Sequence, residues 1–358
     1  MPLRSPLSSR ERVRIALSHQ EPDRVPVAMV CSGINPPARQ AFDALLRRQR
    51  DVTAEAFLAG VLDICGVGPP YVGPPLAPGR DIWGVRRRPV PFGAGSYDEI
   101  EEHPLAGARD PGELARHAWP EVSWFDYGSL PARIAAARAD GDYCLMVANG
   151  NPFETSWYLR GFEQILLDMV AQPELVHALM ERVTGFYVEH FARMLRAAGG
   201  EVDLAFTADD IAGQQGLLLS LPMWRQFIQR YHRRLNEVIH GFGVRVIYHS
   251  DGAVMSAVPG LLEMGIDVLQ ALQFDARGMD AAVLKAEYGD RLCFEGGVSV
   301  QRTLPFGTVA DVEQEVRHLV ATLGRGGGYV LGPSHAIQAG TPPENVLAMF
   351  EAALGEGR

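Results

Sequence analysis

Several side chains that can bind metals or move protons stand at or just beyond the ends of short apolar runs. The four candidates for a divalent metal site are, in chain order, His249, Asp251, Glu295 and His335. Imidazole and carboxylate ligands with open positions are typical of catalytic zinc and non-haem iron. His249 and Asp251 are two residues apart, so on an extended strand both point to the same side. Spacing alone leaves open the plainer alternative, in which each histidine only forms hydrogen bonds to the protein or to a substrate.

A second group of polar residues could handle protons and orient a small molecule. Asp209 could be a general acid or base, or could bind a substrate hydroxyl. The adjacent Asp210 cannot face the same way on a straight strand, so its ordinary role is an N-cap of the next helix, with substrate binding as the alternative. Asp251 and His335 are further catalytic candidates. The remaining candidate substrate-binding residues are Asn149, Asn151, Glu154, Gln273 and Gln301, for which loop capping is the alternative.

The apolar runs themselves predict the fold. Eight of them recur, mostly separated by stretches of helical length, at residues 24–30, 60–65, 143–148, 202–207, 244–248, 268–272, 292–294 and 329–331. Continuous apolar runs alternating with helices indicate parallel strands buried on both faces. Eight such units predict an α/β TIM (β/α)8 barrel, with the active site at the C-terminal ends of the strands.

The rest of the chain is expected to form extensions of this barrel. With 358 residues the chain exceeds the roughly 250 that a barrel needs, and we expect one domain over 1–358 with an N-terminal helical extension over 1–23. Long loops follow the early strands, at 66–97 and 104–124, where proline and glycine are frequent. Arg86, Arg87 and Arg88 form the densest basic run, which is either a solvated edge or a contact with an anionic substrate or partner.

Composition narrows the classes of function. A net charge of −10 argues against a nucleic-acid partner, because phosphate binding needs concentrated positive charge. The four cysteines, Cys31, Cys65, Cys144 and Cys293, have neither metal-motif nor disulfide-framework spacing. No apolar run reaches the roughly 18 residues of a membrane span, and the N-terminus lacks a signal-peptide pattern. We therefore expect a cytoplasmic protein that acts on a small molecule.

Three stretches of the chain resemble the uroporphyrinogen decarboxylase family. They lie at 12–27, at 248–252, and from 328 through His335 to 345. The resemblance implies a TIM barrel, and the superfamily also contains zinc- and cobalamin-dependent methyltransferases. The decarboxylases carry an Arg-rich motif after the first strand, and Cys31 to Asn35 stand there instead. In the methyltransferases a His-x-Cys pair and a later Cys hold zinc, and the matching positions here are His249, Asp251 and His335.

The resemblance leads to a first functional hypothesis and two alternatives. The first is a metal-dependent methyltransferase, with zinc as the expected ion, that moves a methyl group from a methoxylated or similar small substrate to a corrinoid supplied by a partner protein. Replacing thiolates by harder ligands would favour activation of an oxygen substituent over a thiol. The alternatives are a decarboxylase of a small aromatic or heteroaromatic acid, and a barrel that binds a ligand without turnover. The resemblance also implies that a homodimer is common.

Overall fold

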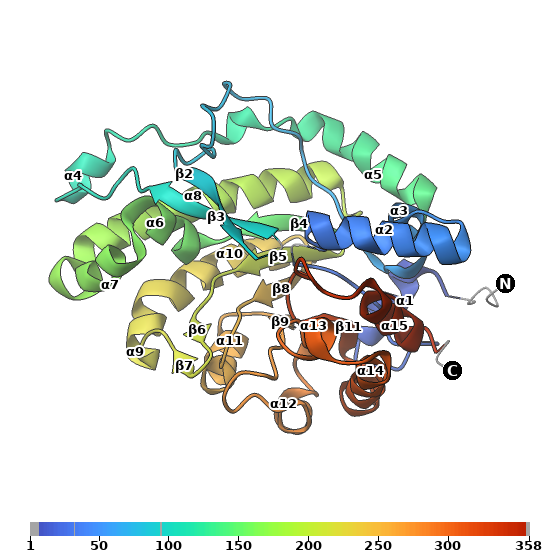
Figure 1. Cartoon of the computed structure of the whole chain (residues 1–358). Helices are drawn as coiled ribbons and strands as arrows, with labels where there is room; N and C mark the ends of the chain where they lie inside the picture. Colours follow the sequence, from blue (N-terminus) through green and yellow to red (C-terminus); the bar gives the residue numbers. More distant parts are fainter. Residues whose placement is uncertain (1–6, 32, 94, 356–358) are drawn as a thin grey trace.

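The centre of the computed structural model is a curved parallel sheet of seven strands; the structure describes residues 7–31, 33–93 and 95–355 (Figure 1). Neighbouring strands pair in parallel throughout the sheet. In spatial order the strands are β1 (Ile64–Gly66), β4 (Cys144–Gly150), β5 (Leu204–Ala208), β8 (Arg245–His249), β9 (Val268–Ala271), β10 (Cys293–Val298) and β11 (Tyr329–Pro333). Seven of the eight predicted runs are therefore strands.

The eighth position of the barrel is filled by an extended segment around Val27. Val27 forms a parallel bridge with Leu331 of β11, and the Ala28 amide donates to the Leu331 carbonyl at 2.9 Å. On its other side the Asp63 amide, just before β1, donates to the Val27 carbonyl at 2.8 Å. The segment thus lies between the two edge strands and closes the ring. The predicted TIM-barrel fold is confirmed, with an irregular first strand.

Alternation along the strands separates the barrel interior from the layer beneath the helices. Leu204, Phe206 and Ala208 of β5 belong to a buried cluster inside the barrel. All the remaining strand positions except β1 also contribute residues to this cluster, and Ile64 of β1 packs against it. Val13 and Leu17 of helix α1 (Ser9–Ala16) and its C-cap join the same cluster and close the barrel from below. The opposite, C-terminal ends of the strands are left for the site.

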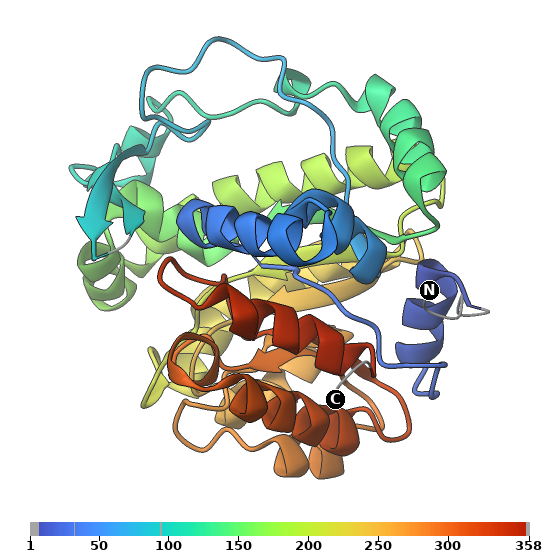
Figure 2. The same cartoon turned by 45° about the vertical axis from the view of Figure 1, so that its right-hand side comes forward.

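Helices surround the sheet (Figures 1 and 2). Helix α1 begins with a capping box between Ser8 and Glu11, as its sequence indicates. The other helices are α2 (Pro36–Arg50), α3 (Ala54–Val61), α4 (Pro111–Leu114), α5 (Leu130–Asp140), α6 (Pro152–Arg160), α7 (Phe162–Ala171), α8 (Pro173–Ala198), α9 (Leu221–Trp224), α10 (Arg230–His240), α11 (Val258–Glu263), α12 (Ala281–Tyr288), α13 (Thr303–Phe306), α14 (Val309–Leu323) and α15 (Pro343–Ala353). Short 3-10 helices lie at Val122–Trp124, Tyr127–Ser129 and Met255–Ala257, and a π-helical segment at Arg225–Gln229 joins α9 to α10.

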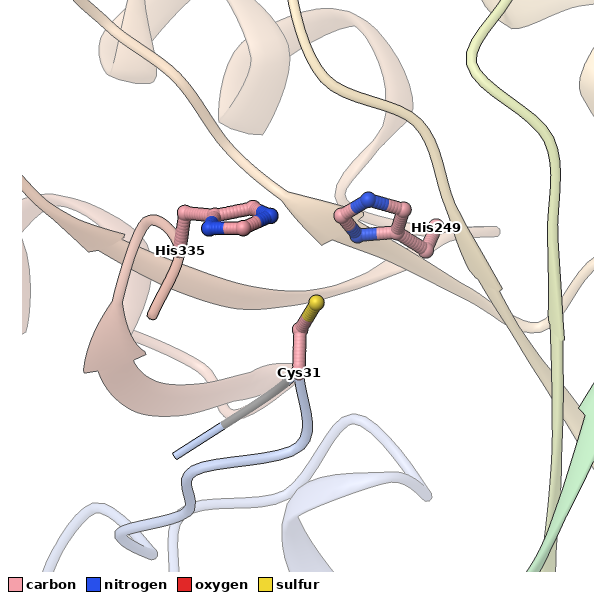
Figure 3. A group of neighbouring side chains, drawn as sticks. All are labelled: Cys31, His249 and His335. Carbon is pink, nitrogen blue, oxygen red and sulfur yellow. The ribbon is translucent and has the colours of Figure 1, made fainter. Parts of the chain in front are cut away.

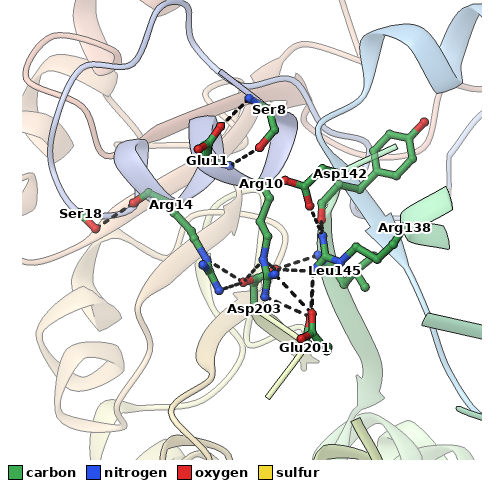
Figure 4. Close-up of polar contacts among 11 residues, drawn as sticks. Ser8, Arg10, Glu11, Arg14, Ser18, Arg138, Asp142, Leu145, Glu201 and Asp203 are labelled. Atoms are coloured by element: carbon green, nitrogen blue, oxygen red, sulfur yellow. Dashed lines mark hydrogen bonds and ion pairs between the residues drawn. The ribbon is translucent and has the colours of Figure 1, made fainter. Parts of the chain in front are cut away.

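Ion pairs hold α1 against the N-terminal end of the barrel (Figure 4). Asp203, directly before β5, accepts from the side chains of Arg10 at 3.0 Å and Arg14 at 2.9 Å. Arg138 of α5 donates to the Glu201 carbonyl at 3.0 Å, on the same side. The 6% exposed Asp203 side chain is therefore a junction between α1 and the sheet.

An antiparallel hairpin that the sequence did not indicate begins within the loop expected over 66–97 and extends to Glu102. Its strands are β2 (Arg86–Phe92) and β3 (Gly95–Glu102). Pro89 and Pro91 argued against a strand there, but a two-stranded ribbon has two open edges where a missing amide is tolerated. A smaller hairpin joins β6 (Ala212–Gly213) and β7 (Gly216–Leu217). Within the described ranges, no helix combines the length and apolar character needed to cross a membrane.

Candidate functional site

A cavity of about 640 Å³ opens at the C-terminal end of the barrel. Its wall is formed by side chains from the strand ends, from α6, from α8, from β2 and from the loop that precedes β2. They are Val30, Cys31, Asp81, Trp83, Arg87, Asn149, Asn151, Glu154, Thr155, Tyr158, Tyr187, Phe206, Ala208, Asp210, His249 and His335. The cavity therefore lies where a barrel fold positions its chemistry.

Two histidines and one cysteine converge on this cavity (Figure 3). His249 ends β8, His335 follows β11, and Cys31 follows the extended segment that closes the barrel. Cys31 Sγ and one ring nitrogen of each histidine all lie within 4.8 Å of one another. Sulfur and imidazole nitrogen are the preferred ligands of zinc, and three protein ligands leave a position open for a substrate.

Cys31 is missing from the ligand set that the sequence predicted. The sulfur comes from the first strand position and not from the two positions where the resemblance implied thiolates. Cys31 does follow an apolar run, just as His335 does. Treating the first run like the other seven would have placed Cys31 at the barrel mouth.

A buried glutamine orients the His249 ring. His249 Nδ1 lies 2.5 Å from Oε1 of Gln270, which belongs to β9 and is 1% exposed. Since an amide oxygen only accepts, Nδ1 carries the proton and Nε2 keeps its lone pair toward the cavity. A ring held in this way has the tautomer that a metal ligand needs.

Carboxylates stand beside the two histidines. Asp251 Oδ2 is 3.7 Å from His335 Nε2, and Asp210 Oδ1 is 3.7 Å from His249 Nε2. The Asp251 amide donates to Asp210 Oδ1 at 2.8 Å, which ties the two loops together. Burial raises the pKa of Asp251, against the opposing effect of the two histidines. Asp251 Oδ1 is buried and has no hydrogen-bond partner among the residues that the structure describes.

The two adjacent aspartates have exchanged the roles that the sequence predicted. Asp210 reaches the cavity, whereas Asp209 is completely buried behind it. Asp209 accepts from the backbone amides of Phe153 at 2.8 Å and Glu154 at 2.7 Å, so it caps the first turn of α6. Its Oδ2 also lies 2.5 Å from Nε2 of the buried His232. These three hydrogen bonds tie Asp209 to the first turn of α6 and to His232 of α10, so Asp209 holds a neighbouring helix from behind the cavity.

The first turn of α6 presents an acid to the cavity. Asn149, Asn151 and Glu154, which the sequence nominated for substrate binding, all line the cavity wall. Asn151 Nδ2 donates to Glu154 Oε2 at 2.7 Å. Burial, with the nearby Asp209 and Asp210, raises the pKa of Glu154 to about 8. Glu154 is therefore largely protonated at neutral pH and can donate a proton.

Glu295 does not belong to the metal-binding group. The strand β10 continues to Val298, so Glu295 lies within the strand and below the barrel mouth. It is 1% exposed and packs against Gly332 of β11, where an added Cβ would come 2.8 Å from Glu295 Oε1. Burial raises the pKa of Glu295 to about 8, partly offset by the Gln270 side chain and the Val30 backbone. The predicted strand ended too early, which made Glu295 resemble a residue at the mouth.

We expect Glu295 to make the protein less stable as the pH rises. The folded-state pKa of about 8 exceeds the ordinary glutamate pKa of 4.5, so between these values the folded protein keeps a proton that the unfolded chain has lost. The free energy of unfolding then falls by up to about 1.4 kcal/mol per pH unit through this group. Urea unfolding of Glu295→Gln between pH 5 and 8 should show a flatter pH dependence than wild type. Glu154→Gln measures separately the contribution of Glu154, the other carboxyl group whose pKa is raised to about 8. If Glu295→Gln leaves the slope of unfolding free energy against pH unchanged, the raised pKa of Glu295 is refuted.

The two predicted glutamines lie outside the cavity wall. Gln273 is 5% exposed, and its Oε1 accepts from the Gly252 amide at 2.9 Å and from Gln214 at 3.0 Å. It therefore shapes the loop that carries Asp251. Gln301 is exposed in the turn after β10, and its backbone amide donates to Ser299 Oγ at 3.3 Å. The longer strand moves Gln301 past the mouth, so its predicted contact with substrate is not supported by its position.

A comparison with protein families agrees with the fold. The family model described as uroporphyrinogen decarboxylase (URO-D) matches residues 100–355, which is more than half of the chain. A solved structure described as a methyltransferase from Methanosarcina mazei superimposes with a TM-score of 0.67, covering 97% of this chain and 98% of that one at 20% identity. This second likeness concerns the fold.

Relatives with curated names include two kinds of enzyme. A methylated-thiol–coenzyme M methyltransferase from Methanosarcina mazei is 26% identical over 241 residues, covering 65% of this chain and 61% of the relative. A uroporphyrinogen decarboxylase from Mannheimia succiniciproducens is 22% identical over 234 residues, covering 62% and 61%. The aligned part thus spans about three fifths of the length of each relative.

Proposed function

The chain belongs to the uroporphyrinogen decarboxylase family, and from this premise we propose that it is a metal-dependent methyltransferase. In this proposal it moves a methyl group from a methoxylated or similar small substrate to a corrinoid that a partner protein supplies. The observation that carries the proposal is the convergence of Cys31, His249 and His335 on the barrel cavity. The methyltransferase relative supports the reaction type.

The donor set fits a zinc ion better than a magnesium or calcium ion. One sulfur and two imidazole nitrogens are borderline or soft ligands, whereas magnesium and calcium prefer oxygen alone. In the proposal Cys31, His249 and His335 hold the ion, and Asp251 is the additional nearby carboxylate. The buried Asp251 Oδ1, which lacks a hydrogen-bond partner within the described residues, supports a positive charge at this place. Bound zinc would supply Lewis-acid polarisation of the heteroatom that carries the methyl group.

The protein's own residues would control orientation and protonation. Gln270 fixes His249 by accepting the proton of Nδ1, which leaves Nε2 available toward the cavity. Glu154 is the proposed proton donor to the oxygen that remains when the methyl group leaves. Its pKa of about 8 keeps the proton available at neutral pH, and Asn151 holds the carboxyl in place.

The metal content of the purified full-length protein tests this proposal. We expect about one zinc ion per chain in wild type, from three protein ligands and an open position. Cys31→Ser, His249→Ala and His335→Ala should each lower the zinc content strongly, because each removes one of three ligands. Cys65→Ser and His318→Ala are matched controls away from the cavity and should retain wild-type zinc. Wild type without a bound divalent ion, or zinc that persists in all three ligand variants, would reject the metal site.

A turnover assay separates the two reaction types in the family. Incubation of methoxylated compounds with a reduced corrinoid should give the demethylated alcohol or phenol and a methylated corrinoid. The decarboxylase relatives motivate the alternative, in which a carboxylic acid releases carbon dioxide without any corrinoid. Carbon dioxide release without demethylation would replace the proposed function with that alternative.

A further inference from the structure

Strand alternation separates the three consecutive arginines of β2. Arg86 and Arg88 are exposed, and both face Glu101 of β3, at 3.0 Å and 4.0 Å. Arg87 points the other way and lines the barrel cavity. The basic run is therefore two solvated ion pairs and one arginine directed at the candidate site.

The Arg87 side chain is held in position from two sides. Its Nη1 donates to Asp81 Oδ2 at 2.6 Å, and its guanidinium carbon lies 4.8 Å from the centre of the Tyr158 ring. Asp81 is itself fixed, since its Oδ1 accepts from the amides of Trp83 at 2.9 Å and Val85 at 3.1 Å. A guanidinium has five N–H donors, and within the described residues the bond to Asp81 is the only hydrogen bond that the Arg87 side chain donates. The remaining donors are available to a ligand.

We propose that Arg87 determines specificity by binding a carboxylate of the substrate. Among the described residues that line the cavity, Arg87 is the only lysine or arginine. A planar guanidinium can donate two parallel hydrogen bonds to the two oxygens of a carboxylate. Stacking on Tyr158 fixes the plane of the guanidinium before the ligand binds. This inference rests on the proposed function and adds to it the substrate class: a small methylated molecule that is also a carboxylate.

The position of Arg87 also defines where the carboxylate lies. Arg87 and Tyr158 line a second, outer pocket of about 440 Å³ as well as the inner cavity, whereas His249 and His335 line only the inner one. The carboxylate therefore binds on the side of the inner cavity that borders the outer pocket. Glu154 on the same wall is mostly protonated at neutral pH, so it does not repel the anion.

Calorimetry with matched anionic and neutral probes tests this proposal. The probes are 3-methoxybenzoate, 4-methoxybenzoate and methoxyacetate, each paired with its own primary amide. Wild-type protein should bind at least one carboxylate more tightly than its amide. Arg87→Met should weaken the binding of that carboxylate roughly tenfold to a hundredfold, the range for a hydrogen bond to a charged group. The affinity for the amide should stay unchanged. Arg87→Lys keeps the positive charge but lacks the planar pair of donors, so it should recover part of the lost carboxylate affinity.

Arg88→Met is the matched control, because Arg88 is on the same strand and faces solvent. It should keep the wild-type preference for the carboxylate, and thermal unfolding should show that all variants are folded. If no carboxylate binds more tightly than its amide, or if Arg87→Met keeps the preference, the proposal is overturned. Carboxylate selectivity without demethylation would reject the proposed function and leave Arg87 as an anion site. Demethylation without carboxylate selectivity would support the proposed function and reject the role of Arg87.

Discussion

Replacing Asp63 by alanine should lower the free energy of unfolding by about 3–5 kcal/mol, the usual cost of removing one partner from a buried ion pair. The Asp63 side chain is fully buried. It accepts from Arg12 at 2.7 Å, from Arg24 at 2.7 Å and from the Val27 amide at 2.8 Å. The substitution therefore leaves two guanidinium groups without this counter-ion, next to the segment that closes the barrel. Urea unfolding followed by circular dichroism measures the loss.

Two further variants make the Asp63 prediction specific. Asp63→Asn keeps the shape and one acceptor oxygen, so it should be less destabilising than alanine. Asp140→Ala removes an exposed aspartate at the end of α5 and should change the free energy of unfolding by no more than about 0.5 kcal/mol. Equal stabilities for Asp63→Ala and Asp140→Ala would show that the buried network contributes nothing to closure.

Replacing Asp209 by alanine should destabilise the protein by at least about 3 kcal/mol, because three buried donors lose their acceptor at roughly 1–3 kcal/mol each. These donors are the amides of Phe153 and Glu154 and the Nε2 of His232. The same change should release the first turn of α6, which carries Glu154. Under the proposed function, methyl transfer should then fall because Glu154 is misplaced, while the amount of bound zinc should stay at the wild-type level.

The readouts for Asp209 distinguish a positioning role from a catalytic one. If Asp209 itself exchanged protons with the substrate, Asp209→Ala would lose activity without a matching loss of stability. Asp290→Ala, an exposed aspartate next to β10, is the control for stability and should resemble wild type. Full stability in Asp209→Ala would contradict the capping role that the geometry assigns.

The fold was predictable because its signals are local. Apolar runs of strand length, and helices with clear start and stop residues such as α8 and α14, can both be recognised within short windows of the sequence. The β2–β3 hairpin was missed because both strands are mostly exposed and β2 contains two prolines, so they lack the apolar pattern of a buried strand.

The site was only partly predictable, because which side chain faces the cavity depends on distant contacts. Asp209 and Asp210 are adjacent and chemically alike, and what separates them is that His232 and the first turn of α6 lie behind Asp209. Glu295 was misplaced by an error of a few residues in the end of one strand. Cys31 was missed because the ligand positions implied by the resemblance follow later strands, whereas Cys31 follows the first apolar run.

The bridge between Val27 and Leu331 also has a consequence for how the protein folds. About 300 residues separate these two bridge partners in the sequence, so the barrel can close only late in synthesis. At about 5–20 residues per second, the segment around Val27 waits for tens of seconds before its second neighbour exists. Asp63, which follows it closely in sequence, can hold that segment against the start of β1 from the beginning. The buried ion pairs of Asp63 would thus hold the segment around Val27 in place while its edge is still unpaired. This is the interval when a nascent chain is most prone to aggregate.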